Sequence, residues 1–111
     1  MTDEARRRRD CCGGGDYGKP RPAVIVQTDV LPAEQASVVV CQMTSEGDDA
    51  QDFRVAVEPS TRNGLRRRSH MMADKLVTIR RTRIGRKIGD FDDGDIARLN
   101  VALAFVMGLA D

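Results

Sequence analysis

Residues 18–29 read Gly-Lys-Pro-Arg-Pro-Ala-Val-Ile-Val-Gln-Thr-Asp, a short loop that runs directly into an apolar stretch. The two prolines restrict this loop, because proline fixes its own φ and confines the residue before it to extended conformations. Lys19 and Arg21 each precede a proline and are therefore predicted to be extended. A cation held in this way at the end of a sheet suits an anionic ligand.

A second apolar stretch covers residues 38–43 and is followed by Thr44 and Ser45. This stretch and residues 23–27 have continuous rather than alternating apolar residues, which is typical of central strands buried on both faces. If the ends of these two strands are neighbours, Arg21 and the two hydroxyl side chains lie side by side.

The rest of the chain predicts further short strands and one helix. Residues 53–57 alternate between apolar and other side chains, residues 59–64 have turn chemistry, and residues 71–80 form another strand. Asp92 is predicted to cap a helix that Gly108 ends. The apolar stripe of this helix consists of Ile96, Leu99, Leu103 and Val106. These elements predict a small, strongly bent antiparallel sheet with a C-terminal helix.

Charge and composition restrict the class of protein. The chain has 111 residues, which predicts one domain, and its net charge is only +1. Charged residues are nevertheless clustered, and a basic face would attract phosphate. Basic clusters lie at residues 6–9, 66–68 and 80–87, and acidic clusters lie at residues 46–52 and 90–95.

The sequence predicts a cytoplasmic protein without a metal site. No apolar run approaches the length of a membrane span, and the N-terminus lacks the apolar core of a signal peptide. The three cysteines, an odd number, fit a reducing compartment better than a disulfide framework. The only histidine, His70, is interpreted as an ordinary surface residue.

An ordered set of motifs resembles the MazF/PemK-type toxins. The match runs from roughly Gly13 to Leu109. Its motifs are Arg21-Pro22 before the first strand, Thr44-Ser45 after the second, Asn63-Gly64-Leu65 before a third, residues 72–79 as an Asp-Gln/Lys-x-x-Thr strand, and residues 83–89 leading into the helix.

The resemblance implies both a fold and an activity. The fold is mainly β, an SH3-like barrel of short antiparallel strands with a C-terminal helix, which forms a homodimer. The activity is that of a type II toxin–antitoxin system: an endoribonuclease that needs no metal and no cofactor and cleaves single-stranded messenger RNA. Its products would carry a 2′,3′-cyclic phosphate and a 5′-hydroxyl. The expected protein partner is an antitoxin whose disordered acidic and apolar tail occupies the RNA groove.

The resemblance also implies roles for individual residues. Arg21, Thr44 and Ser45 match catalytic positions, and Asp74 aligns with an acid that serves as base in some relatives. Arginine cannot readily give up its proton, so charge stabilisation is the larger contribution expected of Arg21. The predicted RNA contacts are Lys19, Arg66, Arg67, Arg68 and Lys75.

The N-terminus departs from the family pattern. Relatives open with a strand of the type Gly-Asp-Ile-Tyr-x-Val-Asp-Leu, whereas residues 7–13 read Arg-Arg-Arg-Asp-Cys-Cys-Gly. Residues 1–19 are expected to be unstructured, with residues 1–12 a disordered or atypical arm and residues 13–111 the toxin domain. The first strand would then be missing or altered. Two alternatives stay open: an inactive relative that binds only the antitoxin, and a CcdB-type toxin that binds gyrase.

Overall fold

The computed structural model describes residues 10–14, 21–26, 35–46 and 53–109. Within these ranges lie six strands, a single-turn 3-10 helix and one α-helix. In chain order they are β1 (Asp10–Gly14), β2 (Ala23–Ile25), β3 (Ser37–Thr44), β4 (Arg54–Val57), β5 (Ser69–Arg80), η2 (Arg81–Arg83), β6 (Ile84–Asp90) and α1 (Asp93–Val106).

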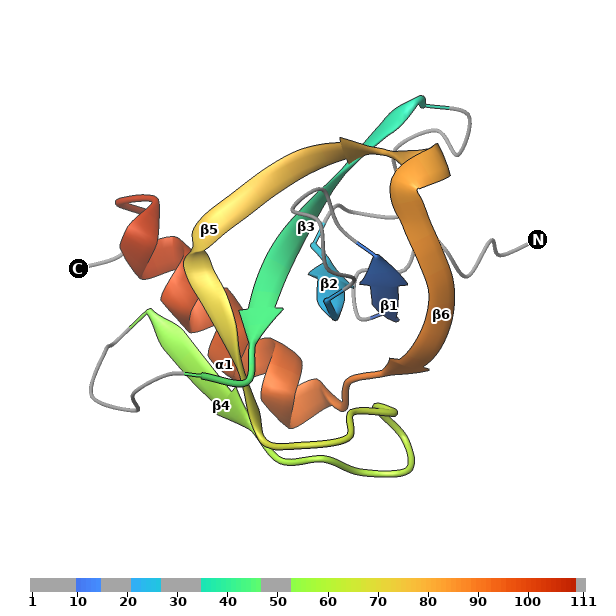
Figure 1. Cartoon of the computed structure of the whole chain (residues 1–111). Coiled ribbons are helices and arrows are strands. Elements are labelled where there is room, and N and C mark those ends of the chain that lie inside the picture. The colour runs from blue at the N-terminus through green and yellow to red at the C-terminus, as the bar shows by residue number, and fades with distance from the viewer. Residues whose placement is uncertain (1–9, 15–20, 27–34, 47–52, 110–111) are drawn as a thin grey trace.

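The six strands form one antiparallel sheet in the order β4-β5-β3-β2-β1-β6. The long strand β5 pairs with β3 along almost its whole length, and residues 69–72 of β5 also pair with β4 on the other edge. Strand β5 is strongly bent (Figure 1). Helix α1 packs against β4 and β5. The mainly β fold with a C-terminal helix is therefore confirmed, as a strongly curved sheet that stays open, with β4 and β6 at its edges.

The core explains why the two central strands are continuously apolar. Val24 belongs to a cluster that also contains Phe91 and Leu99, on the helix side of the sheet. Ile25, the next residue along β2, belongs to a second cluster with Val40. Because neighbouring residues of a strand point to opposite faces, a strand between two such clusters needs apolar side chains at every position.

The expectation that residues 1–19 are unstructured is wrong for Asp10–Gly14. These residues form β1, which pairs with β2 on one side and β6 on the other. Cys11 and Cys12 are buried there, because a free cysteine behaves as a small apolar residue. Strand β1 lies across the predicted boundary between residues 12 and 13, while the arginine run at residues 6–9 lies outside the described residues.

Helix α1 begins and ends where the sequence predicts. The Asp92 carboxylate accepts a hydrogen bond of 2.8 Å from the backbone nitrogen of Asp95, and Gly108 has φ +72° just beyond the C-terminus. The predicted apolar stripe is only partly correct, because Leu99 and Leu103 are buried but Val106 is exposed. In the part of the chain that the structure describes, no helix has the length and apolar character to cross a membrane.

Candidate functional site

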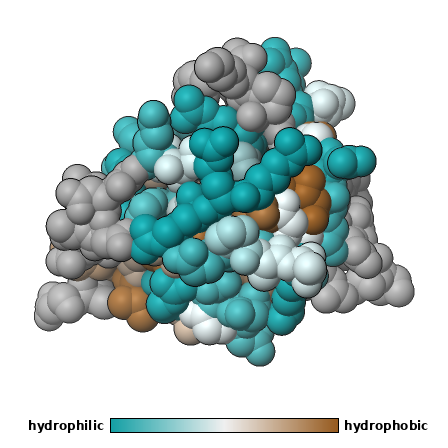
Figure 2. Space-filling view, turned by 60° about the horizontal axis from the view of Figure 1, so that its bottom comes forward, coloured by the Kyte–Doolittle hydropathy of each residue, from teal (hydrophilic) through white to brown (hydrophobic). Residues whose placement is uncertain are grey.

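A groove of about 1040 Å³ lies where several parts of the fold meet. They include the segment before β2, the end of β3, the loop between β4 and β5 with the start of β5, and strand β6, and Gly13 of β1 also lines the groove. Its polar lining consists of Arg21, Thr44, Ser45, Glu46, Arg66, Arg67, Ser69, Arg86 and Lys87. The molecular face that the β4–β5 loop presents is dominated by hydrophilic side chains (Figure 2).

Strand register brings Arg21 and Thr44 together. Strands β2 and β3 are antiparallel, with Ala23 opposite Gln42. Arg21 lies two residues before Ala23 and Thr44 two residues after Gln42, so both side chains come from the same end of the strand pair. The structure therefore places Arg21, Thr44 and Ser45 in one groove, as the ends of the two apolar stretches suggest.

The hydroxyl of Thr44 is held in a turn. Its Oγ1 accepts a hydrogen bond of 3.1 Å from the backbone nitrogen of Glu46. This contact uses a lone pair of the oxygen and leaves the hydroxyl proton available, because a hydroxyl donates and accepts at the same time. Thr44 can thus donate to an anionic oxygen in the groove.

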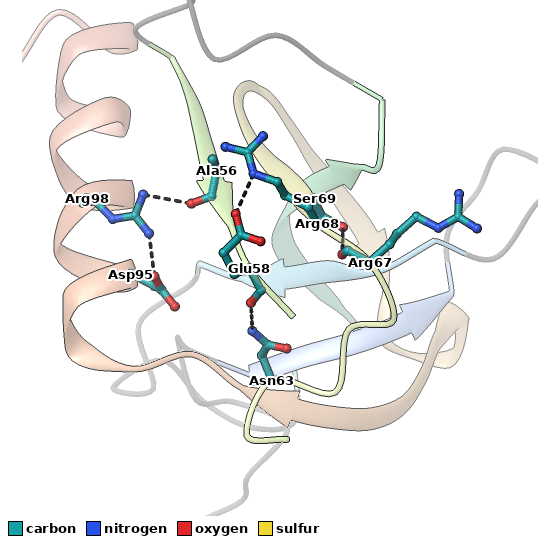
Figure 3. Close-up of polar contacts among 8 residues, drawn as sticks. All are labelled: Ala56, Glu58, Asn63, Arg67, Arg68, Ser69, Asp95 and Arg98. Carbon is teal, nitrogen blue, oxygen red and sulfur yellow. Dashed lines mark hydrogen bonds and ion pairs between the residues drawn. The ribbon is translucent and has the colours of Figure 1, made fainter. Parts of the chain in front are cut away.

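Asn63 holds the loop that carries Arg66 and Arg67. Its buried side chain accepts hydrogen bonds from the backbone nitrogens of Ser60 and Leu65, at 3.0 and 2.9 Å. The same side chain donates to the Glu58 carbonyl oxygen at 2.9 Å (Figure 3). These three bonds fix the turn from both ends.

Two glycines allow this loop to touch β6 through its backbone. A Cβ atom on Gly89 would lie 2.3 Å from the Arg62 carbonyl oxygen, and one on Gly64 would lie 2.1 Å from the Ile88 carbonyl oxygen. Gly64 also has φ +72°, a conformation that favours glycine. The loop and β6 therefore form one continuous wall of the groove.

The arginines of the groove differ from several arginines outside it in their ion pairing. Outside the groove, Arg54 pairs with Asp74 at 3.1 Å, and Arg62 and Arg68 pair with Asp90 and Glu58 at 2.6 Å each. Within the described residues, the arginines that line the groove have no ion-pair partner. They are Arg21, Arg66, Arg67 and Arg86. Positive charge that no carboxylate neutralises attracts polyanions.

Residues 10–107 match the family of PemK-like, MazF-like toxins of type II toxin–antitoxin systems. The chain belongs to this toxin family. It is 36% identical over 97 residues to the probable endoribonuclease MazF of Mycolicibacterium smegmatis, covering 87% of this chain and 88% of that protein. The sequence-based family assignment is therefore confirmed.

Solved structures of related toxins have the same fold. Mycobacterium tuberculosis toxin MazF-mt6 is similar at a TM-score of 0.80 with 25% identity, over 94% of this chain and all of that one. A MazE–MazF structure from Deinococcus radiodurans gives a TM-score of 0.74 with 17% identity, over 93% of this chain and 95% of that one. The altered first strand of this toxin is thus compatible with the family fold.

Several predicted site residues of the toxin lie elsewhere. Arg68 turns toward Glu58 while Arg67 points away from that pair (Figure 3). Asp74 is held by Arg54, and neither Asp74 nor the exposed Lys75 lines the groove. Lys19, which the sequence predicts as an RNA contact, lies outside the described residues.

The structure also adds residues that the sequence-based prediction left out. Arg86 and Lys87 line the groove, as does Glu46, the first residue of the acidic loop that the sequence predicts to flank it. In the sequence these residues belong to clusters of charge. Only the structure shows that β6 and the end of β3 line the same groove. The interpretation of His70 as a surface residue is wrong, because it is 3% exposed between Thr44 on β3 and Ala56 on β4.

Proposed function

We propose that this toxin is an endoribonuclease that cleaves single-stranded messenger RNA in the groove. The main support for the proposal is that Arg21 and Thr44 line the same groove. The other arginines of this groove also lack ion-pair partners within the described residues. The relative at 36% identity that is named an endoribonuclease supports the same activity. Single-stranded substrate is favoured because its unstacked bases are accessible along their edges.

The groove supplies what metal-independent RNA cleavage requires of its phosphate site. The 2′-oxygen attacks the neighbouring phosphorus, the bond to the 5′-oxygen breaks, and a 2′,3′-cyclic phosphate and a 5′-hydroxyl result. The planar guanidinium of Arg21 can grip two phosphate oxygens and stabilise the charge that develops on them. Thr44 donates a further hydrogen bond, and Ser45 offers a second hydroxyl beside it.

The remaining arginines of the groove would bind phosphates on either side of the cleaved bond. Arg66 and Arg67 contribute from the loop and Arg86 from β6. Arg68 and Lys75 remain predicted RNA contacts, but smaller effects are expected of them because they lie outside the groove. Asp74 also lies outside the groove and is paired with Arg54. Both observations weigh against a role for Asp74 as the base.

The partners proposed for the toxin follow from the same groove. An antitoxin with an acidic and apolar tail would compete with RNA for the cations, since both are polyanionic ligands of one surface. We also propose a homodimer with the groove along its two-fold interface, acting in the cytoplasm.

Cleavage of a long, sequence-diverse RNA in excess EDTA tests the proposal. The wild-type toxin is compared with Thr44→Val, which keeps the shape of the side chain and removes the hydroxyl. We expect wild-type cuts at one short motif, with 5′-hydroxyl and cyclic phosphate ends, and a loss of about 100-fold in the variant. No cuts by the wild type would contradict the proposal and leave the inactive antitoxin-binding relative. Poisoning of gyrase without RNA cuts would favour the CcdB-type alternative.

A further inference from the structure

Among the described residues that line the groove, Glu46 has the only carboxylate. We propose that Glu46 is the general base that accepts the 2′-hydroxyl proton of the nucleotide at the cleavage site. This inference rests on the proposed RNA cleavage and identifies the group that begins it. A general base must come within hydrogen-bond reach of the proton that it accepts, so a carboxylate inside the groove is required.

The position of Glu46 follows from that of Thr44. The backbone nitrogen of Glu46 donates to the Thr44 Oγ1 at 3.1 Å, so one turn fixes both residues. In RNA the 2′-oxygen and the phosphorus that it attacks are also near neighbours, within one nucleotide linkage. A hydroxyl that binds the phosphate and a carboxylate that reaches the 2′-oxygen therefore suit two positions of the same turn.

The Glu46 carboxylate is available for a proton. It is exposed and has no ion-pair partner within the described part of the chain, although arginines line the same groove. Asp74, by contrast, is hydrogen-bonded to Arg54 through both of its oxygens, at 3.1 and 3.4 Å. Asp74 is therefore occupied by a residue outside the groove, whereas Glu46 faces the substrate space.

The other groups of the groove are poor bases. Thr44, Ser45 and Ser69 offer hydroxyls, and the arginines stay protonated at neutral pH. Lys87 is a cation paired with Asp10. His70 is buried and does not line the groove, so it is out of reach of a substrate there.

The step balances without any further reagent than water. The Glu46 carboxylate takes the 2′-hydroxyl proton as the bond between the 2′-oxygen and phosphorus forms. The bond from phosphorus to the 5′-oxygen breaks, its electron pair goes to that oxygen, and a water molecule in the open groove protonates it. The protonated Glu46 then returns its proton to solvent, and no atom changes its oxidation state.

Replacement of Glu46 by Gln tests this role. Glu46→Gln keeps the size of the side chain but cannot accept the proton, so kcat should fall by about 100-fold or more while KM for RNA stays near the wild-type value. Glu46→Asp should retain part of the activity. An RNA with a 2′-deoxynucleotide at the cleavage site should bind Glu46→Gln at least as tightly as wild type, which shows that the groove is intact.

The matched control is Glu58→Gln, which changes an exposed carboxylate outside the groove. The kcat of wild type and of this control should fall at acidic pH as a carboxylate is protonated, whereas the residual rate of Glu46→Gln should lack that dependence. Glu46→Gln cleaving within about threefold of wild type would overturn the role of Glu46 alone, as would the same kcat loss in Asp74→Asn instead. No cleavage by the wild type would overturn the proposed function as well.

Discussion

The carboxylate of Asp10 is completely buried, and the ammonium nitrogen of Lys87 lies 3.3 Å from it. Asp10 begins β1 and Lys87 lies on β6 in the wall of the groove, so the pair connects the N-terminal strand to the functional site. A buried carboxylate is strongly destabilising when its partner is removed, because its charge then stays in the interior without compensation. Lys87 is therefore held at this position.

Removal of the lysine charge should destabilise the fold. Lys87→Met leaves the Asp10 carboxylate without this cation, and we expect a loss of about 2 kcal/mol in the free energy of unfolding. The measurement is urea-induced unfolding at neutral pH. The double variant Asp10→Asn/Lys87→Met should recover part of the loss, because it removes the buried charge of Asp10 together with its partner. A double variant less stable than the single one would show that the two residues do not act as a pair.

Arg86 on β6, which has no ion-pair partner among the described residues, should contribute to RNA affinity through its charge. Arg86→Gln should reduce the dependence of log K on log salt concentration by about 0.7 for a single-stranded RNA with a 2′-deoxynucleotide at the cleavage site. Arg80→Gln is the matched control, because Arg80 is exposed and lies outside the groove. Equal slopes for the two variants would place the phosphate path away from β6.

Asn63 should be important for the stability of the loop. Asn63→Ala removes the acceptor of two backbone nitrogens and the donor to one carbonyl oxygen, and we expect it to lower the free energy of unfolding by about 3 kcal/mol. Thr61→Ala, at an exposed position of the same turn, should change it by less than about 0.5 kcal/mol. Thermal or urea unfolding of both variants measures the difference, and similar values would contradict the role of Asn63.

The buried thiols should make the fold sensitive to alkaline pH. Burial raises the pKa of Cys11 and Cys41 to about 12 and that of Cys12 to about 11, from an ordinary 9.0. Because the unfolded thiols ionise first, the stability is complete below pH 9 and is lost as the pH rises toward the folded values. Each thiol contributes about 1.4 kcal/mol per pH unit within that range.

Urea unfolding at pH 7.5 and pH 10 measures this dependence. Cys11→Ala/Cys41→Ala should be less stable at pH 7.5 because it loses packed atoms, but its stability should fall less between the two pH values. A fall equal to that of the wild type would assign the alkaline sensitivity to other groups.

The sequence predicts the centre of the site better than its walls. Arg21 and Thr44 flank two continuously apolar strands, and antiparallel pairing of those strands is sufficient to bring the two residues together. Arg67 and Arg68 are adjacent in sequence, yet only one lines the groove. Which one does so depends on the path of the loop backbone, which the residue types alone do not encode.

Strands β1 and β6 are the two strands of the fold that the sequence does not predict. The charges and glycines of β6 do not predict a strand, because β6 is an edge strand without a fully buried residue. The sequence around β1 does not predict a strand, because an arginine run precedes it and glycines follow it. Cys11 and Cys12 nevertheless have the apolar character that the position of β1 requires. Both strands are defined by pairing with each other, which is a long-range relationship.

The most direct test of the central claim compares two arginines in one cleavage assay. The rate of cutting at the mapped RNA motif, in excess EDTA, is measured for wild type, Arg21→Ala and Arg80→Ala. If the groove is the ribonuclease site, Arg21→Ala loses about 100-fold or more in rate. Arg80→Ala, which removes the same charge outside the groove, stays within about threefold of wild type. Equal rates for Arg21→Ala and wild type would contradict the account.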